Sequence, residues 1–253
     1  MDSNAMEIYP AIDLRAGRVV RLSQGDYGQE TRYVASPLEL ARSYLAAGAR
    51  WLHVVDLDGA RDGTAHDAGE NRAWIAQIAQ LPELKVQTGG GVRTRADFDA
   101  LRALGVARVV VGSLFDRDPQ EVGRWLVASS TEAVCIALDV REIDGQMRVQ
   151  THGWLRDSAL LLEPAIELAL NLGARHFLVT DISRDGMLSG PNHALYQTLA
   201  ERYPSAVFQA SGGVTTLADV ALLARARVHA AVVGKALLEA RFTLREALQS
   251  AAA

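Results

Sequence analysis

The sequence predicts an α/β protein, a single (β/α)8 TIM barrel built from two homologous half-barrels. Three observations predict this fold class. The chain has 253 residues, close to the roughly 250 residues of a typical barrel of this kind. Short apolar runs alternate with amphipathic segments from end to end, as in a parallel sheet covered by helices. The segment Gln87–Phe115 also recurs without a gap as Gln209–Leu237, which indicates an internal duplication.

The expected elements follow one another in strict alternation. Short runs rich in Val, Ile and Leu are expected to be buried parallel strands, namely Glu7–Asp13, Trp51–Asp56, Leu84–Thr88, Arg108–Val111, Ala133–Val140, His176–Asp181, Ala206–Ala210 and Ala230–Val233. Helical periodicity between and after them predicts helices over Pro37–Ala47, Gly69–Gln80, Arg95–Leu104, Pro119–Ala128, Ser158–Leu172, Asn192–Tyr203, Leu217–Arg225 and Leu244–Ala251.

Several of the helix boundaries carry chemical signals. Ser36 and Asp118 each precede a proline, the arrangement of an N-cap residue with proline at the first helical position. Gly48, Gly105 and Gly173 follow expected helices, where glycine commonly ends a helix. Because no linker divides the chain, residues 6–253 are expected to form one closed barrel domain, and residues 1–5 are interpreted as a vector-derived tail. An open doubly wound sheet is the alternative, and the duplication argues against it.

Composition and charge exclude several classes of function. The net charge of −4 argues against general binding to nucleic acid or to an anionic membrane. No apolar run reaches the length of a membrane-spanning helix. The single cysteine, Cys135, allows no disulfide framework and favours a reducing cytoplasm. The histidines show no metal-ligand spacing, so no metal or cofactor is expected. With no obvious partner surface, a monomer is favoured.

The duplicated segment carries glycines at matching places. Gly90-Gly91 pairs with Gly212-Gly213, and Gly112 pairs with Gly234. Glycine turns that open helices present free backbone N–H groups, and the helix dipole favours an anion there. One such turn could need glycine for its geometry alone. Two matched pairs favour two phosphate sites, and therefore a ligand with two phosphates.

Two acidic side chains occupy equivalent ends of strands in the two halves. The run Ala11–Arg15 resembles Ala137–Arg141, which places Asp13 and Asp139 at the ends of the first and fifth strands. These strands face each other across an eight-stranded barrel, at the rim where such barrels keep their chemistry. Two carboxyl groups over one substrate can act as base and acid if their pKa values differ. The alternative is that each aspartate only caps a helix or anchors a loop.

Other polar residues have two interpretations each. Thr180 has the inward parity of its strand, and Asp185 is either a second acid or the anchor of an Asx turn. His53 also points inward, although a lone histidine among apolar residues is usually structural. The long segments Arg15–Tyr33 and Arg141–Asp157 are expected to be loops that act as lids. Trp154 in the second lid could stack on an aromatic base or anchor the lid.

Combined motifs along the chain resemble the barrel isomerases of histidine biosynthesis. They are Pro10–Leu14, Val20–Asp26, Val55–Asp58, Gly89–Arg93, Ala137–Val140, Gly153-Trp154, Thr180–Gly186, Ser211–Val214 and Val233–Leu237. The resemblance covers essentially the whole chain from Met6. It implies an Amadori rearrangement of an aminoaldose to an aminoketose, on a substrate with two phosphoribosyl groups and without a metal or cofactor.

The resemblance also implies roles for individual residues. Asp13 would be the general base and Asp139 the general acid, with Thr180 assisting and Asp185 as the rival acid. Arg21 and Trp154 would engage the substrate from the two lids. One phosphate would bind at Gly91, Gly112 and Ser113, and the other at Gly213, Gly234 and Lys235.

Three competing interpretations stay open. The related cyclase of the same pathway usually carries Cys before the first aspartate and Lys at the position of Arg21. This chain has Ile12 and Arg21 at these positions, which favours the isomerase. A dual isomerase that also accepts phosphoribosylanthranilate tends to carry Arg before the Gly-Trp pair, where this chain has His152, and this difference argues against dual activity. A non-catalytic phosphosugar-binding barrel would not need both Asp13 and Asp139.

Overall fold

The structure is a computed structural model and describes residues 5–23, 25–62, 69–151, 154 and 156–252. Of the tail predicted at residues 1–5, only Ala5 lies within this part of the chain. The position before the Gly-Trp pair, His152, lies outside the described residues, so the argument against dual activity stays a prediction.

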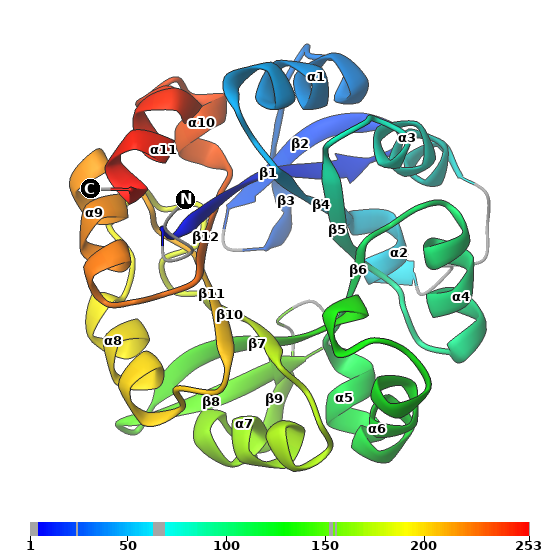
Figure 1. Ribbon diagram of the computed structural model, residues 1–253, viewed down its shortest axis with the longest axis vertical. Helices are drawn as coiled ribbons and strands as arrows, with labels where there is room; N and C mark the ends of the chain where they lie inside the picture. Colours follow the sequence, from blue (N-terminus) through cyan, green and yellow to red (C-terminus); the bar gives the residue numbers. More distant parts are fainter. Residues whose placement is uncertain (1–4, 24, 63–68, 152–153, 155, 253) are drawn as a thin grey trace.

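Eight parallel strands form a closed barrel (Figure 1). They are β1 (Glu7–Arg15), β4 (Trp51–Asp56), β5 (Lys85–Gly89), β6 (Arg108–Val111), β7 (Val134–Ile143), β10 (His176–Asp181), β11 (Val207–Ser211) and β12 (Ala230–Val233). Each strand pairs with the next in this order, and β12 pairs back onto β1 with Glu7 opposite Ala230. The predicted barrel is therefore confirmed, and the open doubly wound sheet is wrong.

Helices surround the barrel because each buries an apolar face against the strands (Figure 1). The longer ones are α1 (Pro37–Ala47), α3 (Glu70–Ala79), α4 (Arg95–Ala103), α6 (Pro119–Ala128), α7 (Leu162–Asn171), α8 (His193–Arg202), α9 (Leu217–Arg225) and α11 (Leu244–Ala251). Short helices are α2 (Leu57–Asp62), α5 (Ser113–Arg117) and α10 (Lys235–Leu238), with a 3-10 turn, η1, at Thr131–Ala133. Within the described part of the chain, none of the helices is long and apolar enough to cross a membrane.

The internal repeat extends to the details of the backbone. Thr94 and Asp97 form a reciprocal capping box at the start of α4, and Thr216 and Asp219 form the same box at the start of α9. Each box satisfies free N–H groups of a helix terminus. The two halves therefore use the same local chemistry, as expected for a duplicated unit.

The expectation that both long segments are loops is wrong, because each folds into antiparallel strands. β2 (Arg18–Ser23) and β3 (Asp26–Arg32) follow β1, while β8 (Gln146–Thr151) and β9 (Arg156–Leu161) follow β7. The tight turns after β1 and β7 place consecutive residues at positive φ, Ala16-Gly17 and Asp144-Gly145, as two-residue hairpin turns require. The helix predicted from Ser158 consequently begins only at Leu162.

Polar side chains fill part of the barrel interior below the rim. Gln87 on β5 and Gln209 on β11 exchange two hydrogen bonds of 2.6 and 2.8 Å. Arg108 on β6 lies opposite Gln87 in the strand pairing and is 3 % exposed, with its guanidinium carbon 4.3 Å from the centre of the Trp51 ring. Its guanidinium also contacts His176 on β10, whose ring nitrogen lies 2.7 Å from a Glu132 carboxylate oxygen.

Two buried histidines in this interior should make folding depend on pH. Burial lowers the pKa of both His53 and His176 from 6.5 to about 4. Between pH 6.5 and about 4 the unfolded chain binds more protons than the folded protein, because both rings stay neutral in the fold. The contribution of these two histidines to the free energy of unfolding is therefore fully present above pH 6.5 and is lost as the pH falls toward 4. Urea unfolding between about pH 7 and about pH 5 should show a loss approaching 1.4 kcal/mol per pH unit for each group. His176→Gln should remove one group's share, and an unchanged slope would contradict this assignment.

Candidate active site

A cavity of about 250 Å³ opens at the carboxyl ends of the barrel strands. All eight parallel strands contribute to its wall, through residues that include Ala11, His53, Gly89, Val110, Ala137, Leu178, Ser211 and Val232. Nine of the predicted site residues also line it, namely Asp13, Arg21, Gly91, Gly112, Ser113, Asp139, Trp154, Thr180 and Asp185. The barrel thus brings most of the predicted site together at one place.

Strand alternation turns the two predicted catalytic carboxyl groups toward this cavity. Asp13 and Asp139 line the cavity from β1 and β7. Of the residues before them, Ile12 is fully buried in the core and is not among the described lining residues, whereas Leu138, 1 % exposed, packs in the same core and also contributes to the cavity lining. Asp139 lies directly opposite Thr180 of the neighbouring strand β10. The internal repeat therefore aims one carboxyl group from each half at the same space.

Asp13 is paired with a buried guanidinium. Arg21, from β2, places one nitrogen 2.9 Å from Asp13 and another 2.8 Å from Asp185, which follows β10. Burial raises the pKa of Asp13, Arg21 opposes this rise, and the Asp185 charge adds to it. Burial alone would lower the pKa of Arg21, but the two carboxylates outweigh burial and raise it. The guanidinium is consequently a permanent positive charge beside Asp13.

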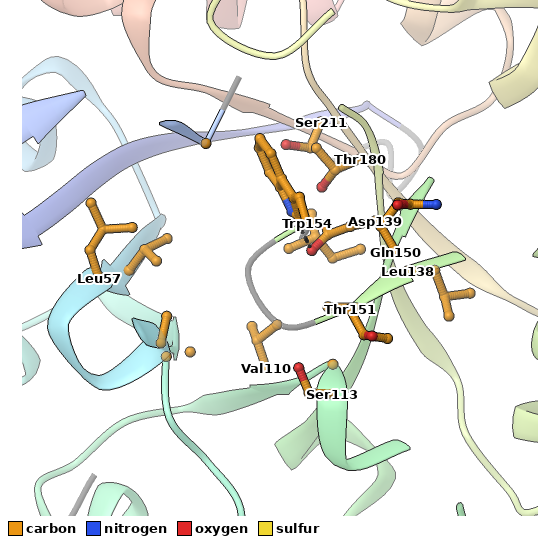
Figure 2. A pocket seen from close by; sticks show the side chains of 18 of the residues that line it. Leu57, Val110, Ser113, Leu138, Asp139, Gln150, Thr151, Trp154, Thr180 and Ser211 are labelled. Carbon is orange, nitrogen blue, oxygen red and sulfur yellow. Dashed lines mark hydrogen bonds between the residues drawn. The ribbon is translucent and has the colours of Figure 1, made fainter. Parts of the chain in front are cut away.

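Asp139 is bound instead by neutral donors. The indole N–H of Trp154 donates to Asp139 at 2.8 Å, and the Thr180 hydroxyl also bonds to this carboxyl group. Burial raises the pKa of Asp139, the bonds from Trp154 and Thr180 oppose the rise, and Asp185 adds to it. Figure 2 shows the indole beside Asp139, with Thr180 and Ser211 close by. A carboxyl group without a paired cation gives up its proton less readily than one beside Arg21.

The first predicted phosphate site lies open to the cavity. Gly91 has a positive φ of 75°, and Gly112 precedes α5, whose first residue is Ser113. All three residues line the cavity, and Figure 2 shows Ser113 across it from Thr180. Backbone N–H groups at such a turn suit an anion.

The second predicted phosphate site has the same backbone conformation as the first, but the Arg21 side chain covers it. Gly234 has φ −109° and ψ −85°, against −112° and −85° at Gly112. Gly213, Gly234 and Lys235 are nevertheless absent from the described residues that line the cavity. A Cβ atom at Gly234 would lie 2.8 Å from an Arg21 guanidinium nitrogen, so Arg21 covers this glycine. Lys235 donates to the Gly186 carbonyl at 2.8 Å.

The two hairpins meet over the cavity. Gly25, in the turn between β2 and β3, lies so close to the Trp154 ring that a side chain there would collide with it. Tyr27 of the same hairpin donates from its hydroxyl to the Leu57 carbonyl at 2.8 Å and lines the cavity. The sequence reasoning missed Tyr27 and Gln150, another lining residue, because it treated both hairpins as loops. The Asp144-Gly145 dipeptide was the signal that could have found the second hairpin.

Fold and site together define a barrel enzyme with paired carboxyl groups suited to acid–base chemistry. The family model described as histidine biosynthesis protein matches residues 7–243. The chain therefore belongs to the histidine biosynthesis protein family.

Similar proteins come from several bacteria. One from Pseudoalteromonas atlantica is 43 % identical over 243 residues, covering 96 % of this chain and 98 % of the relative. One from Stenotrophomonas maltophilia is 48 % identical and covers 95 % and 98 %. One from Klebsiella pneumoniae is 46 % identical and covers 96 % and 98 %. Each is named as a 1-(5-phosphoribosyl)-5-((5-phosphoribosylamino)methylideneamino)imidazole-4-carboxamide isomerase.

Removing the indole donor should change the titration of Asp139. Trp154→Phe keeps an aromatic ring but loses the N–H bond that lowers the pKa of Asp139, so that pKa should rise further. Carbon-13 NMR titration of the aspartate carboxyl groups would measure the change. Trp74→Phe, on the outer helix α3, is the matched control and should have no effect. An unchanged or lower pKa in Trp154→Phe would show that the bond does not hold Asp139 in solution.

Proposed function

We propose that the protein is the isomerase of L-histidine biosynthesis that converts the aminoaldose named in its relatives into the corresponding aminoketose. Near-full-length relatives at 43 to 48 % identity are named as imidazole-4-carboxamide isomerases, and the matching family model is described as a histidine biosynthesis protein. The single structural observation that supports it most is the pair of aspartates, Asp13 and Asp139, from equivalent strands that line one cavity.

The proposed reaction is an Amadori rearrangement by general acid–base catalysis. Protonated Asp139 gives its proton to the ring oxygen of the phosphoribosylamino group, the C1′–O bond breaks, and a protonated Schiff base forms. The Asp13 carboxylate then removes the proton from C2′ and gives an enolamine. Return of a proton to C1′ and loss of the hydroxyl proton at C2′ leave the ketone, so product and substrate are isomers. Each proton transfer contributes roughly 10²–10⁴-fold.

The surroundings of the two aspartates support this division of labour. Arg21 favours the ionised form of Asp13, as a base requires. Among the described residues no cation is paired with Asp139, and burial raises its pKa despite the hydrogen bonds from Trp154 and Thr180, which suits a group that must donate a proton. Asp185, held by Arg21 at 2.8 Å, is the rival acid in this scheme.

Binding of a doubly phosphorylated substrate requires the two hairpins to rearrange. The cavity of about 250 Å³ is smaller than the roughly 300–1,000 Å³ of most ligand pockets. Arg21 covers Gly234 and Trp154 lies beside Asp139. We infer that both side chains move when substrate enters, so that one phosphate binds at Gly91, Gly112 and Ser113 and the other at Gly213, Gly234 and Lys235.

We further propose that the enzyme is a cytoplasmic monomer that needs no metal or cofactor. The single cysteine, Cys135, is fully buried inside the barrel, which suits a protein without disulfides. The net charge of −4 supports a small-molecule substrate rather than a nucleic acid or a membrane.

Asp13→Asn should abolish turnover without abolishing binding. The amide keeps the shape of the carboxyl group but cannot accept the C2′ proton, so kcat should fall by roughly 10²–10⁴-fold or more. Substrate affinity, measured by calorimetry, should stay within about tenfold, since the phosphate sites carry the binding energy. Asp99→Asn, on the exposed face of α4, is the control. Turnover at the normal rate in Asp13→Asn would remove this residue as the base.

A genetic experiment separates this function from the cyclase of the same pathway. Expression should restore growth without histidine to bacteria that lack the isomerase, and should fail in bacteria that lack the cyclase. Rescue of the cyclase strain alone would overturn the proposal. An assay with phosphoribosylanthranilate tests the dual isomerase, and robust turnover would contradict a single activity.

The pH profile of kcat/KM should identify the acid. Raised pKa values of Asp13 and Asp139 place both limbs above the ordinary aspartate value of 3.8. Activity should fall at low pH as Asp13 gains a proton and at high pH as the acid loses its proton. Asp139→Asn should eliminate the alkaline limb, whereas Asp185→Asn should keep it. The reverse pattern would make Asp185 the acid.

A further inference from the structure

A chain of hydrogen bonds connects Arg108, the first residue of β6, through Gln87 with His53 in the cavity wall. His53, on β4, is 6 % exposed and lines the cavity together with Asp13 and Arg21. The Gln87 amide lies 3.2 Å from His53 Nδ1. On its other side, Gln87 contacts Gln209 and Arg108. The mechanism above uses none of these buried groups.

Arg108 fixes the orientation of the Gln87 amide. A guanidinium can only donate hydrogen bonds, and Arg108 approaches one Gln87 side-chain atom at 3.4 Å. That atom must therefore be the carbonyl oxygen. A flipped amide would oppose its N–H groups to the guanidinium. The Gln87–Gln209 pair alone would not decide, because it could form with both amides flipped.

Arg108 cannot turn away, because it is held on several sides. Its Nε donates to the Glu132 carbonyl at 2.9 Å, and its plane lies over the Trp51 ring. A terminal nitrogen approaches the Tyr9 hydroxyl at 3.3 Å. With the carbonyl of Gln87 facing Arg108, the amide nitrogen of Gln87 faces His53.

The orientation of Gln87 in turn decides where His53 carries its proton. An amide N–H needs an acceptor, so Nδ1 of His53 must be unprotonated. Burial and the nearby charge of Arg21 together lower the pKa of His53 to about 4, so the ring is neutral at physiological pH. A neutral ring that accepts at Nδ1 carries its proton on Nε2.

We propose that Arg108 and Gln87 are positioning residues that hold His53 as its Nε2–H tautomer, so that His53 donates a hydrogen bond to an oxygen of the bound substrate. The tautomer follows from the hydrogen-bond geometry, whereas the contact with substrate rests on the function proposed above. Arg108 and Gln87 act on the substrate only through His53.

Nitrogen-15 NMR of the histidine side chains tests the tautomer directly in the unaltered protein. The His53 resonance is assigned by its loss in His53→Gln. At about neutral pH, Nδ1 should show the shift of an unprotonated ring nitrogen and Nε2 that of a protonated one. A protonated Nδ1 would overturn the proposal, whatever the enzyme's activity.

We call the contacts from Arg108 through Gln87 to His53 the relay. Gln87→Glu changes the hydrogen bonding of the relay with almost no change in side-chain shape. The new carboxylate would be ionised beside Arg108 and could only accept, so it should draw a proton onto Nδ1 of His53. We expect the Nδ1 resonance to move to the protonated position and kcat/KM to fall about tenfold, the worth of one neutral hydrogen bond.

The internal repeat supplies a matched control in Gln209→Glu. Gln209 contacts Gln87 and Cys135, not His53. The described contacts of Gln209 include no guanidinium, so a buried carboxyl group there should be protonated, and its O–H replaces the amide N–H. The His53 resonances should stay unchanged, and kcat/KM should stay within about twofold. Equal effects of the two variants, or no effect of Gln87→Glu on the His53 resonances, would overturn the relay. A normal relay without isomerase turnover would instead contradict only the proposed function.

Discussion

Gln87 and Gln209, which occupy equivalent positions in the internal repeat, hydrogen-bond each other inside the barrel. The duplication that places them there also determines the arrangement of the strands and of the site. Gln87 and Gln209 meet because β5 and β11 occupy equivalent places in a ring closed by β12 and β1. The same duplication sets two capping boxes, two glycine turns and two hairpins at equivalent points. A closed ring of equivalent halves forms a cavity at the shared rim, and each half lines it with the aspartate of its first strand, Asp13 or Asp139.

The scaffold is close to symmetric, but the proposed mechanism requires the two aspartates to differ, and the two hairpins give them different surroundings. The first hairpin brings Arg21 to Asp13 at 2.9 Å, while the second brings the Trp154 indole to Asp139 at 2.8 Å. One carboxyl group is paired with a cation and the other with neutral donors. In the mechanism that we propose, these surroundings rather than the strand positions make Asp13 the base and Asp139 the acid. Arg108 makes the barrel interior asymmetric as well. It contacts Gln87, whereas the equivalent residue Gln209 contacts Cys135.

Much of the fold could be predicted because periodicity and terminal residues are local signals. The bounds of α1, α6, α9 and α11 agree with the prediction, and Gly48, Gly105 and Gly173 all have the positive φ expected after a helix. The hairpins were missed because their polar composition masked strand pairing, although Asp144-Gly145 marks one turn. The position of Arg21 over Gly234 could not be predicted. It depends on contacts between segments far apart in the sequence, which composition and spacing do not encode.

We propose that the two equivalent half-barrels hold the two phosphates of one substrate and place its central sugar between Asp13 and Asp139. The most direct measurement is a crystal structure of Asp13→Asn with that substrate bound. We expect one phosphate against the N–H groups of Gly91 and Ser113, the other against Gly213 and Gly234, and Arg21 displaced from Gly234. A single phosphate site, with Arg21 still covering Gly234, would contradict it.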